Sequence, residues 1–179
     1  AGSEFQVNQY VDKEQNSPTV AIRGDGHFVI TWQSNGQDGS ETGVFARMYD
    51  KDGNHGNEFR VNSTTNFDQT SPGAAMDADG NYVIAWNHTI SGDRDVYAQM
   101  YDNEGNPIGA EFRVNTYTVG GQGGGRVAMN ADGYFVILWN SRDQVSSTSE
   151  NDVFIQLYDP EGNRLGSEFQ VNECTCEDN

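Results

Sequence analysis

The chain has 179 residues and a formal net charge of −17, from 10 Lys and Arg side chains against 27 Asp and Glu. So acidic a surface repels phosphate backbones and anionic lipids, which excludes nucleic acid as a partner and disfavours membrane docking by charge. No apolar run reaches the ~18–20 residues of a membrane span, and 11% aromatic residues with 21 glycines are untypical of both disordered and helical chains.

A pentapeptide, Glu-Phe-(Gln/Arg)-Val-Asn, occurs four times and divides the chain into repeats. Its copies begin at Glu4, Glu58, Glu111 and Glu168. The repeating units are residues 4–57, 58–110 and 111–167, followed by a last pentapeptide at 168–172 and a polar, cysteine-containing tail at 174–179. We therefore expect a single repeat domain over residues 1–173.

Alternation of apolar and polar residues predicts four strands in each unit, here described for the first. Residues 20–22 form a short strand with Ala at its centre, which indicates close approach to another backbone. Residues 28–32, Phe-Val-Ile-Thr-Trp, are apolar on both faces, which is typical of a strand buried on both sides. Residues 44–49 have one aliphatic and one mixed face, and the half-polar pentapeptide suits an outer edge. Asp-Gly pairs such as residues 25–26 provide the tight turns.

Each unit is thus predicted to be a four-stranded antiparallel meander that resembles a propeller blade, and the whole chain an all-β fold of three tandem meanders. Propellers usually have about 4–8 blades. Two chains could therefore close one ring, or the blades could stack along an open axis. A threefold closure of the β-trefoil or β-prism type is the alternative.

The residues that carry this pattern also resemble a known repeat. They are Gly-Asp-Gly-His-Phe-Val-Ile-Thr-Trp-Gln-Ser (24–34), Val-Phe-Ala-Arg-Met-Tyr-Asp (44–50) and Glu-Phe-Arg-Val-Asn (58–62). They are similar to a repeat common in large secreted or cell-surface bacterial proteins, which is predicted to form β-propeller-like blades. The resemblance covers essentially the whole chain and implies an extracellular or cell-surface location. Such repeats often accompany calcium-binding and adhesin modules.

The sequence contains no pattern typical of a catalytic site. His27, His55 and His88 occupy different places in their units, and no Ser/His/Asp spacing recurs around them. Most carboxylates fall in expected hairpin turns, so no glycosidase-like pair can be chosen. We therefore expect a protein that is not an enzyme and needs no cofactor.

Calcium is the one metal for which the sequence offers candidates. Asp50 and Asp52, like Asp77 and Asp79, alternate ahead of a Gly, as at the start of an oxygen-rich calcium loop. Neither segment shows the closing bidentate Glu of an EF-hand. Plain hairpin turns are therefore the favoured interpretation, and Ca²⁺ binding is the alternative.

Two kinds of covalent modification are suggested by short motifs. Asn62 and Asn87 each begin an Asn-x-Thr/Ser triplet, so they are candidates for N-glycosylation if they are exposed. Cys174 and Cys176 are separated by one residue, at which a mutual disulfide would be strained. A disulfide to another molecule is one possibility, and free thiols are the other.

The pentapeptide is present once more than the other strands. The N-terminal copy, formed by Glu4, Phe5, Gln6, Val7 and Asn8, is therefore surplus within the chain. An unpaired strand favours pairing with another molecule. A boundary cut through a longer repeat array would explain the surplus equally well.

Two functions follow from these features. The first is an exported structural or adhesive protein that self-associates head-to-tail through its surplus strand, into an extracellular filament that carries glycans. The alternative is a lectin-like module that binds glycans through the variable segments 33–48, 87–100 and 140–157. Aromatic and Asn/Asp side chains of those segments would supply stacking and hydrogen bonds. Differences in length and composition among the three segments favour the first function.

Overall fold

The computed structural model describes residues 3–145 and 151–172, which form three antiparallel four-stranded sheets. Blade 1 consists of β1 (Gln15–Ile22), β2 (Phe28–Asn35), β3 (Thr42–Tyr49) and β4 (Phe59–Arg60). Blade 2 consists of β5 (Asp68–Met76), β6 (Tyr82–Ile90), β7 (Asp93–Tyr101) and β8 (Pro107–Arg113). Blade 3 consists of β9 (Gln122–Met129), β10 (Phe135–Ser141), β11 (Asp152–Tyr158) and β12 (Phe169–Gln170). The prediction of an all-β chain of three tandem meanders is confirmed.

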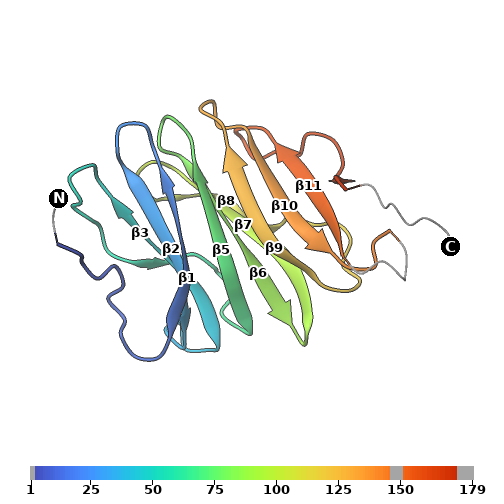
Figure 1. The fold of residues 1–179 in the computed structure, drawn as a ribbon, viewed down its shortest axis with the longest axis horizontal. Coiled ribbons are helices and arrows are strands. Elements are labelled where there is room, and N and C mark those ends of the chain that lie inside the picture. The colour runs from blue at the N-terminus through green and yellow to red at the C-terminus, as the bar shows by residue number, and fades with distance from the viewer. Residues whose placement is uncertain (1–2, 146–150, 173–179) are drawn as a thin grey trace.

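The blades stack in a row, with the N-terminus at one end and the C-terminus at the other (Figure 1). The inner strand of blade 2, β5, packs across blade 1, and the inner strand of blade 3, β9, packs across blade 2. The sheet order within each blade follows the chain, so the Ala-containing strand lies innermost and the pentapeptide outermost, as expected. The threefold closure considered as an alternative does not occur. No helix that could cross a membrane is found in the described part of the chain.

The central strand of blade 2 explains how the blades bind one another. Successive side chains of a strand point to opposite sides, so Tyr82, Ile84 and Trp86 face blade 1 while Val83 and Ala85 face blade 3. All five side chains are at most 1% exposed. We call the first side of each blade its aromatic face and the second its aliphatic face.

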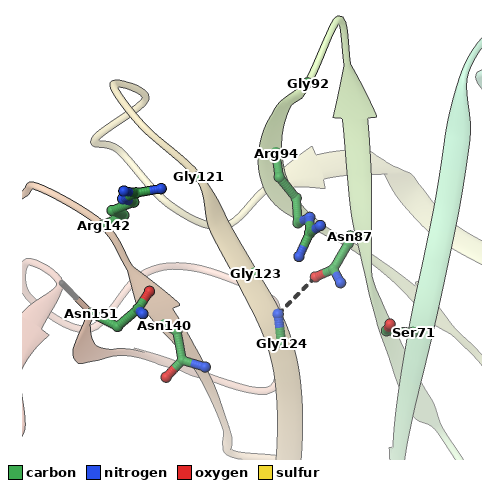
Figure 2. Close-up of a pocket in the computed structure, with 10 residues that line it drawn as sticks. All are labelled: Ser71, Asn87, Gly92, Arg94, Gly121, Gly123, Gly124, Asn140, Arg142 and Asn151. Atoms are coloured by element: carbon green, nitrogen blue, oxygen red, sulfur yellow. Dashed lines mark hydrogen bonds between the residues drawn. The ribbon is translucent and has the colours of Figure 1, made fainter.

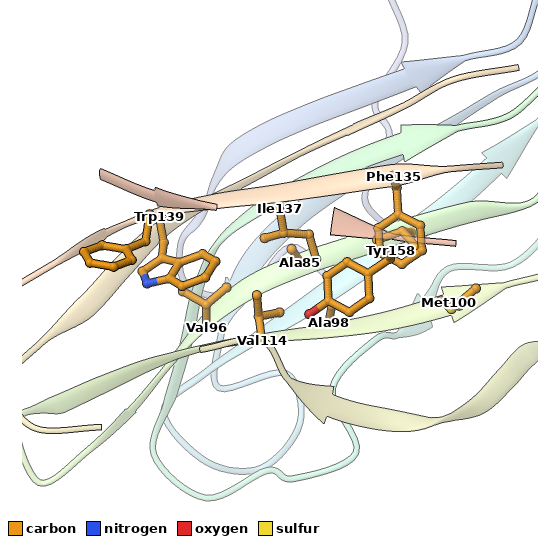
Figure 3. Packing of buried hydrophobic residues seen from close by; sticks show 11 residues of the cluster. Ala85, Val96, Ala98, Met100, Val114, Phe135, Ile137, Trp139 and Tyr158 are labelled. Carbon is orange, nitrogen blue, oxygen red and sulfur yellow. The ribbon is translucent and has the colours of Figure 1, made fainter. Parts of the chain in front are cut away.

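Each interface places the aliphatic face of one blade on the aromatic face of the next. In the first interface the buried residues are Ala21, Val29, Val44 and Ala46 against Tyr82, Ile84, Trp86 and Tyr101. In the second they are Val83, Ala85, Val96 and Ala98 against Phe135, Ile137, Trp139 and Tyr158 (Figure 3). Since burial of one Val or Ile side chain contributes about 1.5–3 kcal/mol, these two layers provide most of the force that holds the blades together.

The repeated pentapeptide connects neighbouring blades. Its Glu accepts a backbone N–H just after the preceding copy, in the pairs Glu58–Gln9 (2.6 Å), Glu111–Ser63 (2.7 Å) and Glu168–Thr116 (2.7 Å). Its Phe packs on the next blade, as Phe59 does against the ring of Tyr101 at 5.6 Å. Its Asn binds the third strand of its own blade, since Asn62 Oδ1 accepts from Val44 N at 2.7 Å. These contacts explain why Glu, Phe and Asn are constant, and the constant Val is buried in the two internal copies, as Val61 and Val114.

Candidate functional site

A polar pocket of about 460 Å³ opens between blades 2 and 3. Six polar side chains line it: Ser71 on β5, Asn87 on β6, Arg94 on β7, Asn140 and Arg142 on and just after β10, and Asn151 ahead of β11 (Figure 2). They come from two units of the repeat that are far apart in sequence. The stacking of the two blades therefore creates the pocket.

A glycine run on β9 forms one wall of this pocket. A Cβ atom at Gly123 would lie 2.6 Å from Cδ of Arg94, so only glycine lets the arginine lie against the strand. Gly124 has φ +77°, a conformation that other residues rarely adopt. Its N–H donates to Asn87 Oδ1 at 2.9 Å, which fixes that amide at the pocket wall (Figure 2).

The pocket concentrates positive charge in an acidic chain. Arg94 and Arg142 are two of only 10 cationic side chains. Within residues 3–145 and 151–172, Arg94 makes no ion pair, and the nearest carboxylate to Arg142 is that of Asp143, at 3.9 Å from Nε. No carboxylate of these residues lines the pocket. The guanidinium group of Arg94 is thus available to an anionic ligand, and that of Arg142 shares only a long, exposed ion pair with Asp143.

The two predicted glycosylation residues are both buried. Asn62 is 1% exposed, and its Nδ2 donates to Thr64 O at 2.8 Å and to Gln69 Oε1 at 2.9 Å. Asn87 is 3% exposed and bonds Gly124 as described. Attachment of a glycan needs a free, accessible amide nitrogen. The folded chain therefore disfavours N-glycosylation at either residue.

Two of the four carboxylates considered for calcium, those of Asp50 and Asp77, stabilise hairpin turns. Asp50 accepts from Asn54 N and Nδ2, both at 2.8 Å, and these hydrogen bonds hold its pKa below the usual value. Asp77 binds its own turn in the same way, Asp52 pairs with Lys51 at 2.8 Å, and the backbone carbonyl of Asp79 accepts from a blade 1 arginine. No cluster of three or more His, Cys, Asp or Glu fit for a metal ion exists in the described ranges.

The surplus N-terminal pentapeptide lies against blade 1 without forming a strand. Phe5 packs on the Tyr49 ring at 5.9 Å, and Arg47 Nη1 donates to Val7 O at 2.7 Å. Among the described residues, Glu4, Phe5, Gln6, Val7 and Asn8 make no backbone-to-backbone hydrogen bond. Cys174 and Cys176 lie outside the described residues.

Sequence reasoning located the pocket only in part. It named the segments 87–100 and 140–157 as possible glycan contacts, and both contribute to the lining. It also expected aromatic side chains there, but no described aromatic residue lines the pocket. His88 on β6 is 6% exposed, and its ring centroid lies 5.2 Å from that of Tyr97 in an edge-on arrangement.

Comparison with known proteins gives a fold and no family. No family model and no curated protein matches the chain. The endo-arabinase from Bacteroides thetaiotaomicron VPI-5482 is 15% identical with a TM-score of 0.57, over 87% of this chain and 60% of that one. The Hadza microbial sialidase Hz136 is 12% identical with a TM-score of 0.58, over 88% of this chain and 37% of that one. The chain thus spans less than two thirds of either protein, and the similarity is one of fold.

Both of these similar structures are named as enzymes, which contradicts the expectation that the chain is not an enzyme. That expectation relied on the absence of a recurrent catalytic spacing in the sequence. In stacked blades, however, neighbouring side chains come from separate units and have no fixed spacing. Arg94 and Arg142, 48 positions apart by their numbers, illustrate this in the polar pocket.

Proposed function

We propose that the chain binds an acidic carbohydrate in the polar pocket between blades 2 and 3. The observation that carries this proposal is the convergence of Arg94 and Arg142 with Asn140 and Asn151, with no described carboxylate among them. A guanidinium group can hold a sugar carboxylate with two parallel hydrogen bonds. Each amide both donates and accepts, as neighbouring hydroxyls of a sugar require.

The size and chemistry of the pocket suit such a ligand. A volume of about 460 Å³ lies within the usual range for small-molecule sites. The lack of a described aromatic lining residue favours recognition by hydrogen bonds and charge over stacking on a sugar ring. The names of the two similar proteins, an endo-arabinase and a sialidase, denote carbohydrate substrates and support the same ligand class.

Isothermal titration with matched neutral and uronic-acid oligosaccharides tests the proposal. We expect binding of the acidic sugar only, weakening as salt is raised because the contact is electrostatic. Arg94→Ala and Arg142→Ala should each reduce affinity by about tenfold or more, as loss of one charged hydrogen bond predicts. Arg126→Ala, at an exposed arginine outside the pocket, is the matched control. Product analysis of the same mixtures would reveal any cleavage.

Equal affinity for the neutral and the acidic oligosaccharide would contradict the proposal. So would binding of the acidic sugar that both pocket variants retain in full. Either result would mean that the sugar binds elsewhere on the molecule or is held only by unspecific electrostatic attraction.

A further inference from the structure

The outward face of blade 3 is half of an interface of the kind that joins the blades inside the chain. Three aliphatic-face positions of blade 2 are Ala85, Met100 and Val114, which are 0%, 7% and 0% exposed because blade 3 covers them. The same positions in blade 3 are Leu138, Leu157 and Val171, which are 38%, 38% and 54% exposed. The apolar surface that a neighbouring blade buries in blades 1 and 2 is therefore exposed on blade 3, as far as the described residues show.

Blade 1 presents the complementary half at the opposite end of the row (Figure 1). Val20 and Ile22 on β1 are 60% and 66% exposed. Their counterparts on β5, Ala74 and Met76, are partly buried in the interface with blade 1. The aromatic face of blade 1 is thus exposed at Val20 and Ile22, whereas Trp32 and Tyr49 of the same face are already buried.

The N-terminal pentapeptide already occupies part of this place. The Phe5–Tyr49 pair, at 5.9 Å, repeats the inter-blade pairs Phe59–Tyr101 and Phe112–Tyr158, both at 5.6 Å. Residues 4–8 therefore lie where the outermost strand of a preceding blade would lie. The rest of that blade is what the aromatic face of blade 1 lacks.

The side-chain oxygen of Asn8 lacks, among the described residues, the hydrogen bond that its counterparts in the later copies accept. In the three later copies, the Asn Oδ1 accepts from a third-strand N–H, in the pairs Asn62–Val44 (2.7 Å), Asn115–Val96 (2.8 Å) and Asn172–Val153 (2.7 Å). Asn8 donates through Nδ2 to Tyr10 O at 2.7 Å, much as Asn62 donates to Thr64 O. Its Oδ1 accepts no hydrogen bond from the described residues. The missing donor is the third strand of another blade.

The sequence identifies which third strand fits. Residues 2–8 and 166–172 are identical, Gly-Ser-Glu-Phe-Gln-Val-Asn, whereas the two internal copies have Arg in place of Gln. In the C-terminal copy this Gln binds the neighbouring strand: Gln170 Nε2 on β12 donates to Oδ1 of Asp152 on β11 at 3.0 Å. Gln6 can make the same bond to Asp152 of another molecule. The two segments are therefore interchangeable on the edge of β11.

We propose that the partner of these end faces is a second copy of this chain, stacked head-to-tail. Blade 3 of one copy covers the aromatic face of blade 1 of the next copy. Residues 4–8 of that next copy replace residues 168–172 on β11, so that each junction repeats an internal interface. Because the two contacting surfaces differ, the contact generates rings or open filaments.

A polar contact beside the apolar layer fits the same arrangement. In the internal interfaces, Gln33 Oε1 accepts from Ser71 N at 2.8 Å and Asn87 Oδ1 accepts from Gly124 N at 2.9 Å. Asn140 follows the Trp of β10 as Gln33 follows that of β2, and it is exposed. The corresponding donor is the backbone N–H of Ser17, which shares the positive φ of Ser71. Asn140 of one copy would therefore bind Ser17 of the next.

Sedimentation velocity over a concentration series tests the proposal by blocking one face at a time. Ile22→Asp should block the aromatic face and Leu138→Asp the aliphatic face. Each variant alone should be monomeric, because the contact needs one face of each kind and every copy of a variant keeps the same single working face. An equimolar mixture should form a 1:1 complex and nothing longer. Association of the unaltered chain should strengthen with salt, because each copy carries a charge of −17.

Strand replacement is tested by two substitutions at equivalent residues of the identical segments. Val7→Asp weakens the incoming segment and should reduce association by about tenfold or more. Val171→Asp weakens the competing segment and should increase association, because residues 168–172 have left the face in the joined copies and Val7 takes the place of Val171. Circular dichroism confirms that each variant keeps its β-sheet signal.

A monomer at every concentration and salt level, with folded protein, would overturn the proposal. A mixture of the two face variants that stays monomeric would overturn it as well. If Val7→Asp and Val171→Asp both left association unchanged, stacking would not involve strand replacement and that part of the proposal would be wrong. Asn140 also lines the polar pocket, so binding of acidic sugar is measured on the Ile22→Asp variant, in which no neighbouring copy engages Asn140, and the two proposals can then fail separately.

Discussion

Val83 and Val136 occupy the same position on the aliphatic faces of blades 2 and 3, and they provide the sharpest test of the stacked fold. Val83 is 0% exposed in the interface with blade 3, while Val136 is half-buried at the end of the row. Replacing Val with Ala removes two carbon atoms, worth about 0.8 kcal/mol each when buried. The residual cavity raises the expected loss for Val83→Ala to about 2–3 kcal/mol in the free energy of unfolding.

Val136→Ala leaves no enclosed cavity, so we expect a loss of about 1 kcal/mol or less. Urea unfolding followed by tryptophan fluorescence measures both values, at a concentration low enough to avoid association. The same chemical change at equivalent positions isolates the effect of the interface. Equal losses for the two variants would show that blade 3 does not cover blade 2 as described, and the account of the fold would be wrong.

Three further predictions concern hydrogen bonding and ionisation. Asn62→Ala removes a buried cap and should cost about 2–3 kcal/mol in urea unfolding, whereas Asn172→Ala, at an exposed copy of the same residue, should cost about 1 kcal/mol or less. Burial raises the pKa of Tyr158 to about 12, so stability should be complete below the unfolded value near 10 and lost as the pH rises toward 12. Its hydroxyl is buried without a partner among the described residues, so Tyr158→Phe should retain stability at pH 9 and lose less of it at pH 11; an unchanged alkaline loss would refute this. A hydrogen bond from Asn106 lowers the pKa of Asp102, so its contribution should be present above pH ~4 and lost as the pH falls through the folded value, and Asp102→Asn should flatten that acid limb of the urea midpoint.

The architecture could be predicted because each blade repeats the same local pattern. In residues 28–32 and again in residues 82–86, the period of two predicts which side chains share a face of the sheet. The Asp-Gly turns predict the order of the strands. The number of pentapeptides also predicted that residues 4–8 have no strand partner within the chain, and in the described part of the structure they form no strand. These features depend on neighbours in sequence, which a single chain displays directly.

The polar pocket could not be predicted in the same way. Arg94 and Arg142 become neighbours only when blade 3 stacks on blade 2, and the angle of that stacking is set by the packing of buried side chains such as Trp139. The burial of Asn62 was likewise invisible in its sequon, because the residue caps a strand that lies 18 positions earlier. The constancy of Asn in all four pentapeptides was the available signal for that structural role.

Chemical cross-linking between copies tests the central claim most directly, that the end faces repeat the internal interfaces. With Cys174 and Cys176 replaced by Ser, a chain carrying Ser17→Cys is mixed with one carrying Asn140→Cys and treated with a short bis-maleimide. A single chain carrying both Gln33→Cys and Ser71→Cys serves as the internal control, because those residues already bond across the first interface. We predict a cross-linked dimer in the mixture together with an internal cross-link in the control. An internal cross-link without any dimer, at concentrations where the unaltered chain associates, would contradict the account.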